Sequence, residues 1–148
     1  MSTSNLTPVE RIGRAVSWYQ SLPAGYDNLE TLLDAARRFA CAIFDFSEEV
    51  GALYKQRNRT EHNRKSAFVM EFRALMSSDP KPSAAAAEKE ADALCLSLRG
   101  EEQQADAEYR AAMLILESAK AVHDQMRQHI SNLKQEKRAE FTGQGAQQ

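Results

Sequence analysis

The chain has 148 residues, of which 43% are apolar and 7% aromatic, and it contains six glycines and four prolines. This composition is typical of long helices rather than of strands and tight turns, so it predicts an all-α fold. The formal net charge of -2 excludes a uniformly basic nucleic-acid-binding protein, so any surface for a polyanion must be a local cluster of cations.

The sequence gives no sign of a membrane segment or an export signal. The longest apolar runs, at 39–44 and 111–116, are far shorter than the roughly 18 residues that span a bilayer. The polar start MSTSN is unlike a signal peptide. Cys41 and Cys95 fall on predicted apolar helix faces, where we expect structural thiols rather than a disulfide. Together these features predict a cytoplasmic protein with no membrane partner.

The first predicted helix covers 8–20. Thr7 supplies a capping side chain, and Pro8 is the residue favoured at the first helical position. LPAG at 22–25 ends this helix. We expect residues 1–6, which precede the cap, to be disordered.

The second predicted helix covers 28–76. Its apolar residues alternate in steps of three and four from Leu29 to Leu53, a period of about 3.5 residues that indicates a coiled-coil-like seam. The pattern resumes at Phe68. SSDPKPS at 77–83 then predicts the turn of a helical hairpin.

The last predicted helix covers 84–139, and 141–148 is predicted to be a flexible tail. RGEEQQ at 99–104 interrupts the apolar pattern of this helix and contains Gly100, which leaves open a bend or a solvated stretch of a straight helix. The predicted fold is therefore a short N-terminal helix on a long antiparallel helical hairpin, forming a single helical domain over 7–140.

A thin hairpin cannot bury a wide apolar stripe along two long helices, so we expect a homo-oligomer. The expected contact between copies lies on the last helix. Its predicted interface residues are Tyr109, Ala112, Leu116, Ala119, His123, Met126, Ile130 and Leu133.

The segment KQRNRTEHNRKS at 55–66 contains no apolar side chain, although it lies inside the second helix. Its five cations and single carboxylate give a local charge of about +4, which suits a phosphate backbone because such a ligand needs many donors and little geometry. Tyr54 and Phe68 bracket the segment and would stack on bases if exposed. The predicted nucleic-acid-binding residues are Lys55, Arg57, Arg59, Arg64, Lys65 and Arg73. The alternative is a solvated helix face whose arginines pair with carboxylates such as Glu101 and Glu102.

Residues 83–108 carry seven acidic side chains against two basic ones, which favours a partner of opposite charge. No histidine lies among these carboxylates at ligand spacing, so we expect neither a metal site nor a cofactor. The chain has no Gly-rich phosphate loop, CxxC pair, HExxH motif or nucleophile elbow. We therefore expect no enzyme.

The order of these parts resembles the UvsY-like recombination mediators of tailed bacteriophages. The resemblance covers about residues 28–138 and rests on the helix ending in NRKSAFVMEFRALMSS, the loop, and the helix ADAEYRAAMLILESAKAVHDQMRQHISNLKQEKR. It implies a small all-helical protein that assembles into rings, binds single-stranded DNA through its N-terminal half and helps a recombinase displace single-strand-binding protein. The family's paired basic positions before the loop fall here near Val69 and Glu71, which are not basic. The cations that stand in for them are Arg64, Lys65 and Arg73.

These observations lead to a principal hypothesis and two alternatives. The first is a non-catalytic, single-stranded nucleic-acid-binding accessory in phage DNA recombination that acts as an oligomer with a recombinase. The second is a structural or inhibitory helical protein that binds another protein through its apolar seam. The third is an assembly chaperone whose acidic segment at 83–108 masks a basic partner.

Overall fold

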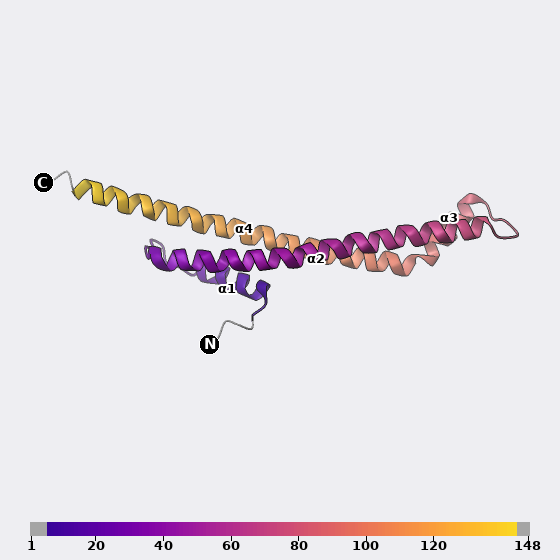
Figure 1. Ribbon diagram of the computed structural model, residues 1–148, viewed down its shortest axis with the longest axis horizontal. Coiled ribbons are helices and arrows are strands. Elements are labelled where there is room, and N and C mark those ends of the chain that lie inside the picture. Colours follow the sequence, from indigo (N-terminus) through magenta and orange to yellow (C-terminus); the bar gives the residue numbers. More distant parts are fainter. Residues whose placement is uncertain (1–5, 145–148) are drawn as a thin grey trace. The chain divides into compact units, whose positions relative to one another are not determined.

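The structure is a computed structural model that describes the backbone of residues 6–144 and the side chains of residues 6–141. Within this range all regular structure is helical, as the composition predicts. The four helices are α1 (Pro8–Gln20), α2 (Leu29–Met76), α3 (Ala84–Leu94) and α4 (Leu96–Gln144) (Figure 1). In the part of the chain that is described, no helix combines the length and apolarity needed to cross a membrane. Except for Leu6, the disorder expected at 1–6 lies outside the described residues. Of the flexible tail expected at 141–148, residues 141–144 are instead helical and the rest lies outside the described residues.

The chain divides into two compact units. Unit 1 comprises Met1–Glu48 and Leu114–Gln148, and unit 2 comprises Glu49–Met113. Each unit therefore contains one part of α2 and one part of α4. The sequence predicts one helical domain over 7–140 and carries no linker that would indicate this division.

α1 begins where the sequence predicts because Thr7 and Glu10 form a capping box. Thr7 Oγ1 accepts a hydrogen bond from the Glu10 backbone N–H at 3.3 Å, and Glu10 Oε2 accepts one from the Thr7 backbone N–H at 2.9 Å. The hydrogen bond from the Thr7 backbone lowers the pKa of the Glu10 carboxyl below its ordinary value. This reciprocal cap satisfies two backbone donors at the start of the helix.

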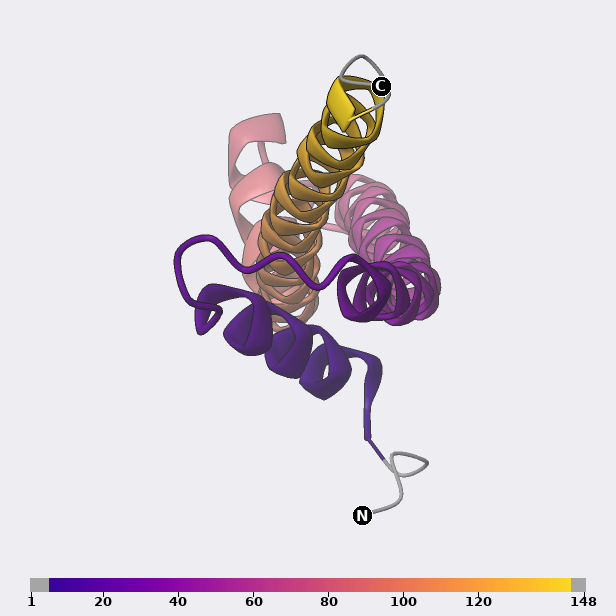
Figure 2. The same cartoon turned by 90° about the vertical axis from the view of Figure 1, so that its left-hand side faces the viewer.

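In unit 1, α1 packs on one side of the pair formed by the first part of α2 and the last part of α4 (Figure 2). An ion pair between Arg11 Nη2 and Asp45 Oδ2, at 2.7 Å, ties α1 to α2. The core between α2 and α4 is centred on the fully buried Phe39, whose ring meets the His123 ring edge to face at 5.7 Å. The buried residues of unit 1 are Ile12, Leu32, Ala36, Phe39, Ala42, Ile43, Phe46, Leu116, Ala119, Met126, Ile130 and Leu133.

The seam of α4 that the sequence predicts for contact between copies packs against α2 of the same chain. Ala112, Leu116, Ala119, Met126, Ile130 and Leu133 are buried, and Tyr109 and His123 are half-buried against aromatic rings of α2. α2 covers this seam because it runs antiparallel to α4 and carries an apolar stripe of the same spacing. The structure therefore corrects the expectation that a thin hairpin leaves this seam open for a second copy.

The last predicted helix is in fact two helices, because the chain leaves the helical conformation at Cys95 (φ -90°, ψ 10°). The Cys95 N–H still bonds the carbonyl four residues back at 3.1 Å, and the Arg99 N–H bonds the Cys95 carbonyl at 3.0 Å. An ion pair of 2.7 Å between Arg99 Nη2 and Asp92 Oδ1 joins α3 to α4 across the break. Gly100, where the sequence allows a bend, lies within α4, which continues beyond its predicted end at 139.

Both cysteines are free, but only Cys95 is buried. Cys41 is exposed, so its predicted place on the apolar face is wrong. It lies two residues from both Phe39 and Ile43, which puts it on the side of α2 opposite the seam.

Candidate nucleic-acid interface

The polar segment 55–66 lies in unit 2 and is helical throughout, so the apolar stripe is interrupted while α2 continues. The segment has no glycine or proline to break the helix. The six cations predicted to bind nucleic acid do not share one face. Two of them face α4, three lie on the opposite side, and one is held by a neighbour in α2.

Arg57 faces α4 and lies in a cluster of charged and aromatic groups. Its Nε is 2.6 Å from Asp106 Oδ1, a close ion pair that lacks the alignment of a hydrogen bond. The guanidinium carbon lies 5.4 Å from the centre of the Tyr109 ring, within the range of a cation–π contact. Arg110 Nε holds the second carboxylate oxygen of Asp106 at 2.8 Å. These contacts occupy Arg57 inside the hairpin.

Arg64 also faces α4, where its Nε donates a hydrogen bond to Glu102 Oε2. This hydrogen bond raises the pKa of Arg64 above its ordinary value. The side chains of Arg64 and Glu102 are each 23% exposed, so the pair is partly removed from water. Of the two predicted carboxylate partners, Glu102 is paired with an arginine, whereas Glu101 is exposed.

Lys65 is exposed and bonds within its own helix. Its Nζ lies 2.5 Å from Glu61 Oε1, one helical turn away. Hydrogen bonding to Lys65 lowers the pKa of the Glu61 carboxyl below its ordinary value. The pair joins two residues of α2, and Glu61 also lines a small pocket with Glu102 and Asp106 of α4.

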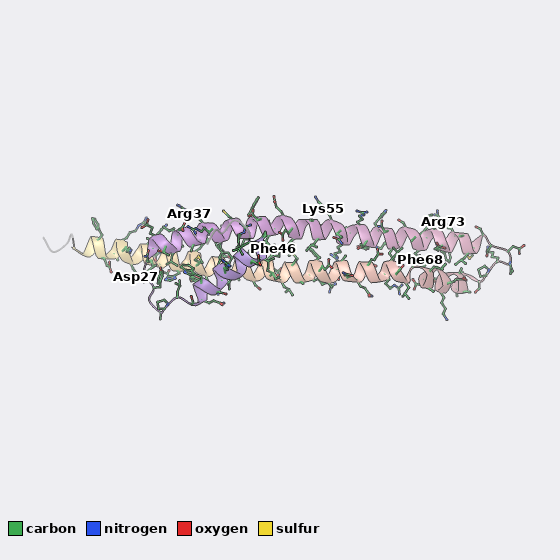
Figure 3. The ribbon with its side chains drawn as sticks, turned by 90° about the horizontal axis from the view of Figure 1, so that it is seen from below. Asp27, Arg37, Phe46, Lys55, Phe68 and Arg73 are labelled. Atoms are coloured by element: carbon green, nitrogen blue, oxygen red, sulfur yellow. The ribbon has the colours of Figure 1, made fainter. Side chains whose placement is uncertain are left out.

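Three cations, Lys55, Arg59 and Arg73, are exposed on the outer side of α2. Figure 3 shows Lys55 and Arg73 on the edge of α2 that faces away from α4, whereas Phe68 lies on the edge that faces it. Within residues 6–141 none of the three cations forms an ion pair. His62 is exposed on the same face, because 55, 59, 62, 66 and 73 follow helical steps of three, four or seven. We call Lys55, Arg59, His62 and Arg73 the outer stripe.

The outer stripe has no carboxylate among its members. Between residues 50 and 76 the acidic residues are Glu61 and Glu71, and neither falls on the steps that define the stripe. Tyr54, at the start of the segment, is 47% exposed while its ring lies 5.5 Å from the Tyr109 ring. Phe68 is half-buried and stacks on Phe72 at 6.3 Å. Tyr54 is therefore more accessible to a base than Phe68.

Residue spacing in the sequence could have distinguished the two arginines that face α4 from the cations of the outer stripe. Ile43, Val50, Arg57 and Arg64 recur at intervals of seven residues. The first two are buried against α4, so the same spacing brings the two arginines to α4 as well.

Across residues 6–141, no group of three or more histidine, cysteine, aspartate or glutamate side chains is placed to hold a metal ion. Comparisons of the chain with protein-family models, with curated proteins and with solved structures found no match. The functional assignment therefore depends on the charge and exposure of the surfaces themselves.

Proposed function

We propose that the protein is a non-catalytic accessory that binds single-stranded nucleic acid through the outer stripe and acts as an oligomer. The observation that carries this proposal is that Lys55, Arg59 and Arg73 are exposed on one face, with no carboxylate between them and in no ion pair with any described side chain. Contacts to a phosphate backbone require accessible cations but little precision in how these cations are positioned. The resemblance of the helical layout to the UvsY-like mediators supports the same class, with recombination as the process.

The outer stripe is long but sparse. From Lys55 to Arg73 it covers about 27 Å of helix at about 1.5 Å per residue. Three phosphate contacts to a single strand give an expected slope of about -2 for log K against log salt concentration. One chain therefore binds weakly, and several copies presenting the stripe together would supply the affinity.

The test is fluorescence anisotropy of a labelled oligo-dT strand and of a duplex of the same length, titrated with protein at several salt concentrations. We expect salt-dependent binding that favours the single strand. The variant Lys55→Gln/Arg59→Gln/Arg73→Gln should lose most of this binding while keeping its helical circular dichroism, because all three side chains are exposed. A matched control with the same net charge, Arg14→Gln/Lys81→Gln/Lys89→Gln, changes exposed cations outside the stripe and should bind as the unmodified protein does.

Two results would count against the proposal. Absence of binding by the unmodified protein at low salt would remove the function. An equal loss of binding in the stripe variant and the matched control would show that total charge, and not the stripe, governs binding.

A second candidate function is binding to another protein. Large apolar side chains exposed on the long helices favour it, among them Met70 at 70% beside the outer stripe. Failure of the nucleic-acid titration together with capture of a defined helical partner would support this candidate.

A further inference from the structure

Unit 1 contains a second positively charged surface, which the sequence does not reveal. Two shallow pockets that share Ala40 and His123 form a groove along α2 and α4, and none of the residues lining it comes from α1. Its apolar lining includes Ala36, Ala40, Ile43 and Ile130, and its charged lining comprises the cations Arg37, Lys120, Arg127 and Lys134 and one carboxylate, Asp124. We call this surface the basic groove.

The cations of the basic groove are exposed and regularly spaced. Lys120, Arg127 and Lys134 recur every seven residues along α4. Arg127 Nη1 lies 3.9 Å from Asp124 Oδ1, but both side chains are more than 70% exposed, so this pair leaves the arginine accessible. The other cations of the groove form no ion pair within residues 6–141. Phe44, which also lines the groove, is 64% exposed and adds apolar surface that water alone covers.

Unit 2 carries a line of opposite charge on α3 and α4. Glu101 and Glu108 are exposed and seven residues apart, and Gln104 between them donates a hydrogen bond to Glu108 at 3.0 Å. One turn apart on α3 lie the exposed Glu90 and Leu94, the latter 58% accessible. None of the three glutamates forms an ion pair within the described side chains. We call Glu90, Leu94, Glu101 and Glu108 the acidic line.

We propose that the basic groove of one copy binds the acidic line of a second copy. On α4, the groove cations Lys120, Arg127 and Lys134 and the carboxylates Glu101 and Glu108 each lie seven residues apart, the spacing by which charged side chains pair beside the seam of associated helices. Each also contributes a large exposed apolar side chain, Phe44 in the groove and Leu94 in the line. Burial of these two side chains adds to the attraction between the charges.

The contact joins different surfaces of the two copies, so a pair of chains keeps one free groove and one free line for further copies. Glu101, Glu108 and the groove cations of α4 belong to one continuous helix, so they cannot pair with one another inside a chain. A polyanion would account for the cations of the groove but not for the exposed carboxylates of unit 2. A second copy of the chain accounts for both. The outer stripe belongs to neither surface, so this inference stands whether or not the protein binds nucleic acid.

Charge exchange tests the contact. One variant, Glu101→Lys/Glu108→Lys, reverses the acidic line, and a second, Lys120→Glu/Arg127→Glu, reverses the groove. Sedimentation velocity over a range of concentrations should show that the unmodified chain self-associates. Each variant alone should associate at least about tenfold more weakly than the unmodified chain, because like charges then face each other.

An equimolar mixture of the two variants should regain the association, as should the single chain that carries all four substitutions. In both cases every Lys or Arg again faces a carboxylate. The control Lys89→Glu/Lys137→Glu makes the same change in net charge as the groove variant, at exposed sites outside both surfaces, and it should associate like the unmodified chain. Circular dichroism establishes that each variant is as helical as the unmodified protein.

Three results would overturn the inference. The first is an unmodified chain that is monomeric at every concentration. The second is failure of both the mixture and the fourfold variant to regain association although all chains are helical. The third is a groove variant that keeps its association and instead loses binding to oligo-dT, which would assign the groove to nucleic acid. Loss of oligo-dT binding by the outer-stripe variant alone, with association unchanged, bears on the proposed function and leaves this contact intact.

Discussion

Replacing Arg64 with leucine should destabilise unit 2 more than replacing Arg64 and Glu102 together. The single change leaves the Glu102 carboxylate facing α2 without its cation, in a position only 23% exposed. The double change places two apolar side chains at facing positions of the helix pair. If the two charges were solvated independently, the double change would cost as much as the two single changes together. A lower cost for the double change than for Arg64→Leu alone would therefore indicate a specific ion pair.

The exposure of the pair sets the size of the effect. Exposed ion pairs contribute about 0.2–1 kcal/mol, and removing one partner of a fully buried pair costs about 3–5 kcal/mol. At 23% exposure for each side chain, the Arg64→Leu variant should lie between these limits, at a loss of about 1–2 kcal/mol. For a chain of this length that loss corresponds to a fall in Tm of roughly 3–6 °C. The Arg64→Leu/Glu102→Leu variant should return to within about 1 kcal/mol of the unmodified protein.

The assay is urea unfolding followed by circular dichroism for the four chains of a double-mutant cycle. The exposed pair Lys65–Glu61, in the same segment, provides a control cycle with a smaller expected coupling. A coupling energy below about 0.3 kcal/mol for Arg64 and Glu102 would refute the reasoning, because that is the size expected of a fully solvated pair.

Three further changes test the core, the cap of α1 and the helical conformation of α4 at Gly100. Phe39→Ala should cost about 3–5 kcal/mol in urea unfolding because the ring is fully buried, whereas Phe44→Ala at low protein concentration should stay within about 0.5 kcal/mol. Thr7→Ala should raise the Glu10 pKa, followed by NMR titration, only part of the way toward its ordinary value, because it removes the side-chain hydrogen bond and keeps the stronger one from the backbone of residue 7. Because the folded pKa of Glu10 is lowered, its stabilisation is present above the unfolded pKa and is lost as the pH falls through the folded value; a Glu10→Gln variant should lack this dependence. Gly100→Ala should stabilise α4 by about 0.5–1 kcal/mol in urea unfolding, since an added Cβ meets nothing within 4 Å; a loss of stability would contradict an unstrained helix there.

Helix ends could be predicted wherever the signal lies within a few residues of the end. Thr7 caps α1 through a side chain that reaches only the first turn. At the end of α2, the Ser77 and Ser78 hydroxyls donate to the carbonyls of Arg73 and Leu75, at 2.9 and 2.7 Å. Such short-range bonds depend on residue type and order alone, so the sequence contains all the information needed.

The break at Cys95 could not be predicted because no local residue causes it. Ala87, Ala91 and Cys95 are buried at intervals of four, so this stripe of α3 packs inside unit 2. Gly100, the residue with the lowest helix propensity in this region, remains helical. The position of the break is therefore set by packing in unit 2, which outweighs the intrinsic preference of one glycine.

The inner arginines show why the apolar stripe of α2 stops at residue 55 and returns at residue 67. In a hairpin with a uniform apolar seam, a slip of seven residues would exchange one apolar contact for another at little cost. A slip of that size that brought Arg64 to Tyr109 and Asp106 would set Arg57 against Leu116, leaving a partly buried guanidinium without a carboxylate. Because an unpaired charge in such a position costs several times more than a lost apolar contact, the polar layer disfavours the slipped pairing. The same twelve residues thus fix the register of unit 2 on one face of α2 and leave the cations of the opposite face free to bind a ligand.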